Sequence, residues 1–381
     1  MEQEYILRLY DTDLLTFSLS EHGLEGLKAK IHEVNQKKLT YLPLDMELTD
    51  TGLLKWLQRR VIPKNRTYVT EILKTFGLNI NNTKGIIDVR KGLSLNDSFW
   101  VIPYGFTGTF AQYNLYENRF SEILSLVAYT GIGQSDAAFT TSPELTTNGM
   151  LPKGWRFIEG DGIYLYKGGT SGAANTRNEP YSEFYASQVT QTMGLHAVRY
   201  ELENWKGILA SCCKLFTDID TAYIPIGRIV REGGLKACLE YYKKLGPEAY
   251  EEMKSMLVFD AVIYNEDRHF GNFGILRDNH SGKLIGSAPI FDNGMSLFNF
   301  AMPQDWKELD GYAKTRGTAY GISFETICQE VMGPVQTRQL RKLIGFTFQR
   351  HPKLNLPEER LLAIERHLQK RVRQLLELLP I

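Results

Sequence analysis

Three oxygen-bearing side chains within residues 265–292 have the types and spacing that phosphoryl transfer requires. Asp267 lies five positions before Asn272 in NEDRHFGNFGIL, and Asp292 follows in APIFDNG. The protein-kinase catalytic loop has the same separation between its Asp and its Asn. In that chemistry the Asp orients the attacking hydroxyl, while the Asn and a later Asp hold Mg²⁺ on the phosphates of ATP. The pattern therefore predicts a catalytic base at Asp267 and magnesium ligands at Asn272 and Asp292.

A β-hairpin is expected to bring the two magnesium ligands together. Residues 273–276 are typical of a short apolar strand, and the turn 277–283 contains Asn, Ser and Gly residues that favour chain reversal. Residues 284–291 then predict a return strand that ends at Asp292. A hairpin of this size would return Asp292 to the side of Asn272.

A helix is expected to lead into the loop 265–272. Residues 247–264 carry apolar side chains at helical spacing, so we predict a helix that ends just before the loop. Inside the loop, His269 lies two residues after Asp267. It could contact a phosphate or the Asp267 carboxylate, and the alternative is an ordinary packed or solvated histidine.

A lysine and a glutamate upstream have the order of the ion pair that aligns ATP phosphates in protein kinases. Residues 151–157 and 163–167 predict two strands around the turn EGDG, and Lys167 ends the second strand. Residues 178–194 predict a helix with Glu183 in its first turn. A glutamate there also complements the helix dipole without any other role, so this alternative remains open.

The segment 207–216, GILASCCKLF, predicts an apolar strand that leads toward the connection between two lobes. In a kinase-like architecture its backbone around Lys214, Leu215 and Phe216 would face the adenine of ATP. The same pattern also suits a strand that is only buried, so both interpretations remain.

The composition indicates an ordinary globular protein. The chain has 381 residues, and its 44 basic and 44 acidic residues give a net charge of zero, which argues against a dominant nucleic-acid surface. No leader and no apolar run of membrane-spanning length is evident, and the four cysteines lack metal or redox spacing. We therefore expect a cytoplasmic protein with reduced thiols.

The remaining elements are predicted from apolar periodicity and from Gly and Pro stops. Strands are expected over 4–10, 14–19, 93–103 and 197–201, and helices over 24–35, 48–60, 66–76 and 357–379. Asn355 and Glu358 resemble a capping box before the last helix. Residues 104–145 are rich in Gly, Asn and Tyr and predict a long ordered connection.

The set N-x-D-R-H-x-x-N-F-G, followed by P-I-F-D-N-G, resembles the HipA-type serine/threonine kinase family, the toxin component of bacterial toxin–antitoxin pairs. IYLYKGG, with Lys167, and YSEFYASQVTQTMGL, with Glu183, are similar to that family as well. TNGMLPKGWR resembles the loop and strand that approach the nucleotide phosphates, with Gly149 and Lys153 at the matching positions. The likeness covers most of residues 145–300 specifically and the remainder loosely.

The resemblance implies an α+β, two-lobed, protein-kinase-like fold with an additional small N-terminal domain and a largely helical C-terminal lobe. We expect the N-terminal domain over residues 1–92, the kinase N-lobe with a preceding connection over 93–216, and the helical C-lobe with the catalytic loop over 217–381.

The resemblance also implies ATP- and Mg²⁺-dependent phosphorylation of a Ser or Thr in a protein. Carried over by position, the catalytic residues would be Asp267 and His269, the magnesium ligands Asn272 and Asp292, and the phosphate-holding pair Lys167 and Glu183. The Gly-rich loop, DFG and APE signatures of ordinary protein kinases are absent, and DNG stands where DFG would. Family members can silence themselves by phosphorylating a serine in the phosphate-binding loop, where the nearest residues here are Thr146 and Thr147.

The family implies two partners, a protein substrate and a small helix-turn-helix antitoxin. No membrane and no direct nucleic-acid contact is expected. Two other functions remain open from the sequence. One is a kinase that acts on a lipid or a small molecule, and the other is a catalytically weak nucleotide-binding partner of a helix-turn-helix repressor.

Overall fold

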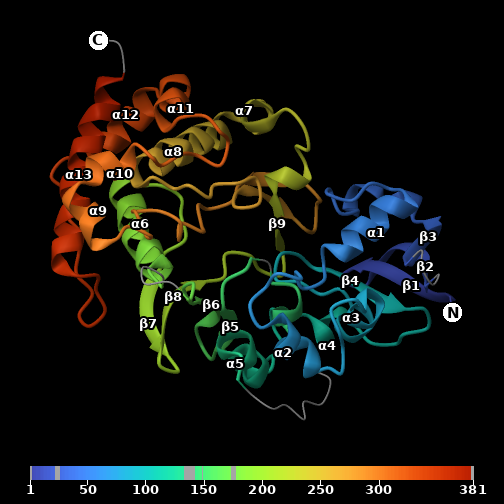
Figure 1. Cartoon of the computed structure of the whole chain (residues 1–381). Helices are drawn as coiled ribbons and strands as arrows, with labels where there is room; N and C mark the ends of the chain where they lie inside the picture. The colour runs from blue at the N-terminus through green and yellow to red at the C-terminus, as the bar shows by residue number, and fades with distance from the viewer. Residues whose placement is uncertain (1, 22–25, 133–141, 148, 173–176, 379–381) are drawn as a thin grey trace. The chain divides into compact units, whose positions relative to one another are not determined.

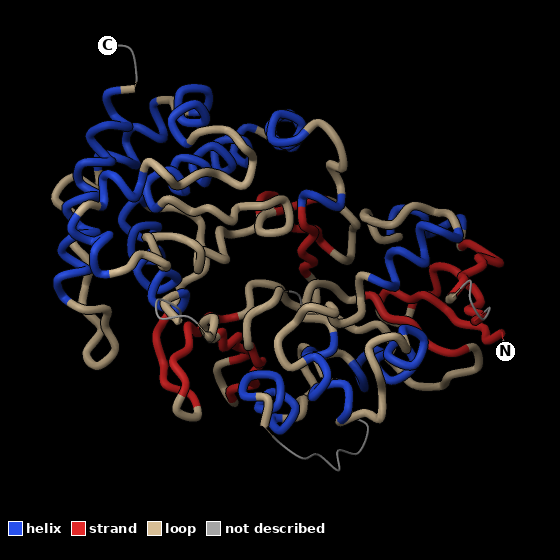
Figure 2. Tube along the Cα trace, viewed as in Figure 1, coloured by secondary structure: helices blue, strands red, loops and turns tan. Residues whose placement is uncertain are grey.

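The computed structural model describes residues 2–21, 26–132, 142–147, 149–172 and 177–378. The chain divides into two compact units. The first comprises Met1–Tyr166, Leu215–Ile224 and Leu276–Ile285, and the second comprises Lys167–Lys214, Pro225–Ile275 and Gly286–Ile381. Figures 1 and 2 show helices and strands in both, so the predicted α+β class is confirmed.

A four-stranded antiparallel sheet forms the beginning of the first unit. Its strands β1 (Glu2–Leu9), β2 (Thr12–Glu21), β3 (Leu27–Val34) and β4 (Phe99–Pro103) have the order β3-β2-β1-β4. Helix α1 (Asp50–Gln58) joins the core of this sheet through buried residues such as Trp56 (Figure 1). The strands predicted over 4–10, 14–19 and 93–103 are confirmed.

The helix predicted over 24–35 is wrong, because the described part of this segment is the strand β3. Leu27, Ala29 and Ile31 alternate with the exposed Lys28 and Lys30, which is the two-residue period of a strand. The strand lies at the sheet edge, where lysines are favoured because they prevent pairing with other chains. Residues 24 and 25 lie outside the described residues.

The rest of the first unit is built from short elements. The helices predicted over 48–60 and 66–76 are confirmed, and residues 104–145 contain helices as well as connections. The further elements are η2 (Gln36–Tyr41), α2 (Val69–Lys74), α3 (Thr83–Arg90), α4 (Phe110–Tyr113), α5 (Glu122–Thr130), η3 (Pro143–Leu145), β5 (Lys153–Ile158) and β6 (Gly162–Lys167). A three-stranded sheet has the order β11-β10-β9, with β9 (Thr221–Pro225), β10 (Gly274–Asp278) and β11 (Leu284–Ser287).

Helices dominate the second unit, and α8 (Pro247–Ile263) is their centre. Every residue of α8 from Ser255 to Ile263 is buried, as expected for a helix surrounded by others. The helices that pack against it are α7 (Gly234–Leu245), α11 (Phe324–Val331), α12 (Pro334–Arg341) and α13 (Glu358–Glu377) (Figure 1). The unit also holds α6 (Glu179–Met193), the antiparallel strands β7 (Glu201–Trp205) and β8 (Ile208–Lys214), η4 (Ile226–Arg228), α9 (Pro303–Lys307) and α10 (Leu309–Ala313).

Three helices predicted for this unit are confirmed, and two local predictions are wrong. The helices correspond to α6, α8 and α13. The strand predicted over 197–201 is only a single bridge between Ala197 and Ile290, with β7 beginning at Glu201. The capping box is absent among the described residues, since Pro357 precedes α13 and the side chain of Asn355 accepts a hydrogen bond from the His351 N–H instead. No helix in the described ranges is long and apolar enough to cross a membrane.

Candidate active site

A buried lysine between two carboxylates forms the centre of the site in the second unit. Lys167 is the last residue of β6, and its Nζ donates a hydrogen bond to Glu183 Oε1 at 2.9 Å. The same nitrogen forms an ion pair with Asp292 Oδ1. Glu183 is fully buried and the Lys167 side chain is 10 % exposed, whereas the Asp292 side chain is 35 % exposed. Lys167 and Glu183 are 16 positions apart in the sequence, and Glu183 and Asp292 are 109 positions apart, so the structure brings together three distant residues.

The electrostatics of this cluster follow from burial and from the opposed charges. Burial lowers the pKa of Lys167, but the carboxylates of Asp292 and Glu183 raise it, and the net result is a pKa above the ordinary lysine value. Burial raises the pKa of Glu183, while Lys167 lowers it and Asp292 raises it. Lys167 therefore carries its charge at neutral pH and holds two carboxylates that would otherwise repel each other.

Helix α6 positions Glu183 and is tied to the segment that follows Asp292. The backbone N–H of Asn293 donates to Glu183 Oε2 at 2.7 Å. On the same helix, Ser182 Oγ donates to the backbone oxygen of Ser296 at 2.9 Å. Because Asn293 and Ser296, which closely follow Asp292, are hydrogen-bonded to the first half of α6, a displacement of the helix would also displace the DNG segment.

The backbone of Asp292 has an unusual conformation that aims its carboxylate at Lys167. Its φ is +56°, in the left-handed region that Asp and Asn adopt more readily than most residues. Its N–H donates to the hydroxyl of Tyr200 at 3.1 Å. The carboxylate orientation is therefore fixed from the backbone as well as by the ion pair.

The loop that carries Asp267 and Asn272 begins directly after α8. Asp267 N–H donates to Asn265 Oδ1 at 3.1 Å, and Asn272 Nδ2 donates to the backbone oxygen of Asp267 at 3.0 Å. These bonds fix the backbone of Asp267 and do not use its carboxylate. They also assign the amide nitrogen of Asn272 to the loop, so the amide oxygen is the atom that could bind a cation.

Arg268, a residue that the sequence motifs did not single out, joins this loop to the DNG segment. Its guanidinium is buried and pairs with Asp260 through two hydrogen bonds of 3.0 and 3.1 Å. Its Nη1 donates to the backbone oxygens of Asn272 at 3.0 Å and Phe291 at 2.5 Å, and its Nη2 donates to Asn293 Oδ1 at 2.5 Å. Arg268 thus connects Asn272, just before the predicted hairpin, to Phe291 and Asn293, which follow it on either side of Asp292.

A signal for Arg268 exists in the sequence. Asp260 is the single charged residue in the apolar run MLVFDAVIY, which covers the last turns of α8 and the residue after it, and a buried carboxylate requires a cationic or hydrogen-bonding partner. Burial raises the pKa of Asp260, and Arg268 opposes this shift. An arginine eight positions later, just past the helix end, is a natural candidate for that partner.

Asp267 and His269 lie in the more accessible part of the loop. Burial raises the pKa of Asp267, and the charge of Asp292 raises it further, while His269, Lys167 and Arg268 lower it. The His269 side chain is exposed, and its Nδ1 accepts a hydrogen bond from the Gly271 N–H at 3.0 Å. A half-buried carboxylate with a raised pKa is suited to accept a proton from a substrate hydroxyl.

The donor atoms at Asn272 and Asp292 fit a magnesium ion that a nucleotide also binds. Mg²⁺ prefers oxygen ligands and is usually held by one or two protein side chains together with phosphates and water. In the described part of the chain, no group of three or more His, Cys, Asp or Glu residues is arranged to hold a metal by itself. An amide oxygen and a half-exposed carboxylate therefore fit a shared site better than a complete protein cage.

The other predicted nucleotide-binding residues are distributed over both units. Gly149 has φ +88°, and a side chain at this position would collide with the Lys153 ammonium. Lys153 is buried at the start of β5, and both residues belong to the first unit. Lys214 is exposed at the end of β8 in the second unit, whereas Leu215 and Phe216 belong to the first.

The two threonines of the sequence prediction are engaged within the first unit. Thr146 is 7 % exposed, and its hydroxyl accepts a hydrogen bond from the buried Arg90 at 2.8 Å. Thr147 Oγ1 accepts one from Trp155 Nε1 at 2.8 Å. Asn148, between them and Gly149, lies outside the described residues.

Comparison with solved structures identifies a shared fold. HipA of Shewanella oneidensis MR-1, from a complex with HipB and its operator DNA, is 13 % identical, covers 99 % of this chain and 100 % of that chain, and has a TM-score of 0.57. The proinflammatory kinase CtkA of Helicobacter pylori is 18 % identical, covers 59 % of this chain and 92 % of that chain, and has a TM-score of 0.47. No protein-family model and no curated protein matches the chain. The likeness to the first structure extends over nearly the whole chain, so the predicted HipA-like fold is confirmed.

Proposed function

We propose that this chain, which shares the fold of Shewanella HipA, is a protein serine/threonine kinase that uses ATP and Mg²⁺. The observation that carries the proposal is the ion-pair cluster of Lys167 with Glu183 and Asp292, joined through Arg268 to the loop of Asp267 and Asn272. Phosphoryl transfer requires a positively charged side chain for the phosphates, ligands for the metal ion and a general base, all close together. In this proposal Lys167 is the positive charge, Asn272 and Asp292 are the metal ligands, and Asp267 is the base.

The transfer step assigns one role to each group. Asp267 accepts the proton of the substrate hydroxyl as its oxygen forms a bond to the γ-phosphorus. The bond from that phosphorus to the bridging oxygen breaks, and ADP leaves with the electron pair. Lys167 holds and neutralises phosphate oxygens, and Glu183 fixes the position of Lys167. Magnesium, held by Asn272 and Asp292, would neutralise charge on the β- and γ-phosphates.

The first test replaces the proposed base. Asp267→Asn keeps the size of the side chain but cannot accept a proton, so phosphotransfer should fall by about 10²–10⁴-fold. The measurement is the transfer of labelled phosphate from ATP to dephosphorylated cell extract, separated into protein, lipid and small-molecule fractions. Glu240→Gln, at an exposed position of α7, is the matched control and should keep wild-type activity.

The outcome also separates the protein kinase from the alternative substrates. Label in the protein fraction that depends on Asp267 supports the proposal, and phosphoamino-acid analysis should find it on Ser or Thr. Label confined to the lipid or small-molecule fraction would identify a different kind of kinase. Equal transfer by wild type and Asp267→Asn would remove Asp267 from the mechanism.

The second test concerns the metal ligand. The affinity for a non-hydrolysable ATP analogue should be at least about tenfold higher with Mg²⁺ than without it in the wild-type protein. Asp292→Ala should lose this magnesium-dependent gain because half of the protein ligands are gone. Isothermal titration with and without Mg²⁺ measures both affinities, with Glu240→Gln as the control. An unchanged magnesium effect in Asp292→Ala would contradict the assignment.

The proposal includes further contacts that follow the HipA likeness by position. Gly149 and Lys153 would approach the nucleotide phosphates, the backbone at Lys214, Leu215 and Phe216 would face adenine, and His269 would lie near the transferring phosphoryl group. HipA of Shewanella was solved with HipB and operator DNA, and we propose by analogy a small helix-turn-helix antitoxin as partner of this chain. The four cysteines are free thiols, which suits a reducing cytoplasm.

A further inference from the structure

Residues 295–299, which follow the DNG segment in the second unit, include two consecutive residues in a strained backbone conformation. Leu297 has φ +51° and Phe298 has φ +58°, in the left-handed region that residues with bulky side chains rarely adopt. Both side chains are buried. Such a conformation costs free energy, so contacts from other parts of the chain must hold it.

Arg360, in the first turn of α13, makes two of the contacts that hold this segment. Its Nη2 donates hydrogen bonds to the backbone oxygens of Phe298 at 2.7 Å and Asn299 at 3.0 Å. The Phe298 oxygen also accepts a bond from the Ala301 N–H at 2.9 Å, and the Asn299 oxygen accepts one from Asn178 Nδ2 at 2.9 Å. The guanidinium thus joins the last long helix to the strained residues through two carbonyl groups.

The guanidinium of Arg360 is buried without an opposite charge. The residue is 3 % exposed, and among the described residues no carboxylate forms an ion pair with it. Burial lowers its pKa to about 10. Its guanidinium carbon lies 5.3 Å from the ring centre of Trp306. Burying an arginine that neutralises no carboxylate costs free energy, which indicates that its bonds to the two carbonyl groups have a role beyond packing.

The same segment is bonded to the loop that carries the proposed base. The backbone oxygen of Met295 accepts a hydrogen bond from the Glu266 N–H at 3.1 Å, and the Leu297 N–H donates to the backbone oxygen of Ile263 at 2.8 Å. Ile263 is the last residue of α8, and Glu266 directly precedes Asp267. The backbone that leads into Asp267 is therefore fixed by this segment.

The proposed metal ligand Asp292 is fixed by other contacts. Its carboxylate forms an ion pair with Lys167, and its N–H donates to the hydroxyl of Tyr200. Neither contact involves residues 295–299. A change at Arg360 should therefore displace the base rather than the groups that hold the nucleotide and its metal ion.

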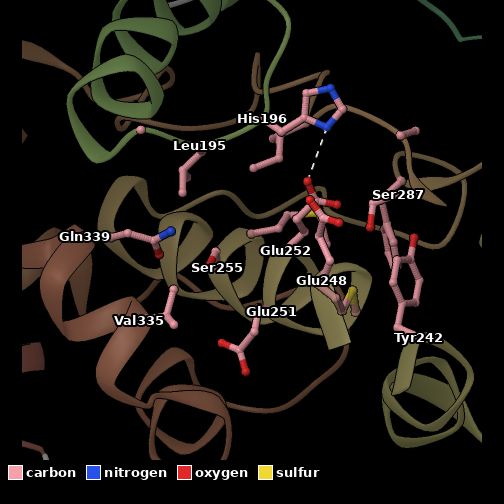
Figure 3. A pocket seen from close by; sticks show the side chains of 16 residues that line it. Leu195, His196, Tyr242, Glu248, Glu251, Glu252, Ser255, Ser287, Val335 and Gln339 are labelled. Atoms are coloured by element: carbon pink, nitrogen blue, oxygen red, sulfur yellow. Dashed lines mark ion pairs between the residues drawn. The ribbon is translucent and has the colours of Figure 1, made fainter. Parts of the chain in front are cut away.

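The first half of α8 borders a cavity of about 270 Å³, and Figure 3 shows Glu252 and Ser255 of this helix in the cavity wall. The lining contains no residue of α13 and none of residues 263–267 or 295–299. The bonds between α8 and the segment 295–299 are therefore at the other end of the helix and are separate from the cavity.

We propose that Arg360 is a positioning residue for phosphoryl transfer. By holding the carbonyl groups of Phe298 and Asn299, it keeps the segment 295–299 in its strained conformation, and the segment fixes the backbone before Asp267. The carboxylate of Asp267 then meets the substrate hydroxyl in the orientation that proton transfer requires. This inference rests on the proposed kinase function and adds α13 to the elements that build the site.

The test compares Arg360→Met with a control that disturbs the same helix. Arg360→Met cannot donate hydrogen bonds, so labelled-phosphate transfer to dephosphorylated cell extract at saturating Mg·ATP should slow at least about tenfold. The apparent KM for Mg·ATP should change by less than about threefold, because Lys167 and Asp292 are held by other contacts. Leu375→Ala, at a buried position near the end of α13, should lower the melting temperature and keep the wild-type rate.

All rates are measured at a temperature at which thermal unfolding curves show every variant to be folded. Arg360→Lys restores a charged donor and should recover part of the rate, which keeps the test decisive should Arg360→Met fail to fold. A lower melting temperature with an unchanged rate in Arg360→Met would show that the residue only stabilises the fold, and it would overturn the proposal. An equal loss of rate in Leu375→Ala would overturn it as well.

Hydrogen exchange followed by NMR tests the positioning without any activity. The N–H groups of Glu266 and Leu297 should exchange faster in Arg360→Met, because their bonds depend on the held segment. The N–H of Asn293, which is bonded to Glu183, should exchange as in the wild type. Faster exchange at Glu266 in a protein that transfers no phosphate would contradict the kinase function and still support the link from Arg360 to the loop. Unchanged exchange at Glu266 would overturn the proposal.

Discussion

Asp267 combines a half-buried carboxylate with neighbours of both signs. Burial raises its pKa above 3.8, and the nearby Asp292 adds to the increase, whereas the cations around it oppose it. A general base acts in its ionised form, so activity should rise with pH through this raised pKa and be full above it. The effect of Asp267 on folding stability has the opposite dependence on pH. The pKa of its carboxyl group is higher in the folded protein than in the unfolded chain, so its contribution to the free energy of unfolding is present below the unfolded pKa. This contribution is lost as the pH rises through the folded pKa.

His269 gives a direct test of this balance. Its charge lowers the pKa of Asp267, so His269→Gln should raise that pKa further. The acid limb of the pH profile of kcat/KM should therefore move to higher pH. The measurement is phosphotransfer over the acidic pH range, with the exposed His32→Gln on β3 as the control. An acid limb that stays in place or moves to lower pH would exclude Asp267 as the titrating base.

At the scale of elements, one arginine holds the loop after α8 to the segment after β11. Arg268 pairs with Asp260 and donates to Asn272, Phe291 and Asn293. The acceptor oxygens of Asp260, Asn272 and Asn293 are in buried residues, and that of Phe291 is in a partly buried one. The positions of Asn272 and Asp292, the two proposed magnesium ligands, therefore depend on a residue that itself need not touch substrate.

Replacing Arg268 should cost both stability and activity. Arg268→Met leaves the Asp260 carboxylate buried without its cation, and this should lower the free energy of unfolding by about 3–5 kcal/mol. Adding Asp260→Leu removes the unpaired charge, so the double variant should be more stable than Arg268→Met alone. Chemical denaturation measures the four proteins of this cycle. A loss below about 1 kcal/mol in Arg268→Met would show that the pair contributes little.

The elements that carry the site could be predicted from the sequence, but their connections could not. Residue periods and Gly or Pro stops locate β6, α6 and α8, and they place Lys167 and Glu183 on the correct elements. The return strand ends at Ser287 rather than at residue 291, because Ile290 bridges to Ala197 far away in the chain. Such long-range contacts, like those of Arg268, leave no periodic signal. Strand β3, which was predicted as part of a helix, does carry the two-residue period of a strand, because Leu27, Ala29 and Ile31 alternate with lysines.

At the scale of the whole molecule, the balance of charge bears on partners. The net charge is zero, with 44 basic and 44 acidic residues, so phosphate contacts would depend on a local surface or on a second protein. The Shewanella HipA structure contains HipB as well as operator DNA. In the proposed arrangement the antitoxin supplies the affinity for DNA.

The chain alone should therefore bind DNA weakly. At about 0.15 M salt, the dissociation constant for a duplex of about 20 base pairs should exceed about 10⁻⁴ M, the weak end of non-specific binding. Fluorescence anisotropy with a labelled duplex measures this value, and a helix-turn-helix protein with its operator serves as the positive control. Micromolar affinity that falls steeply with salt would show that the chain has a nucleic-acid surface of its own.

The ion pairs around Lys167 and Arg268 have one more consequence, which concerns electroneutrality. The ion pairs join three carboxylates, those of Glu183, Asp260 and Asp292, to two cations, and the charges of Asp292, Lys167 and Arg268 also act on the fourth carboxylate, that of Asp267. Two negative charges are left over. One divalent ion would neutralise both charges, whereas one sodium or potassium ion would leave one negative charge uncompensated. The preference for a divalent ion would therefore come from the charge of the whole cluster, which includes side chains that do not bind the ion.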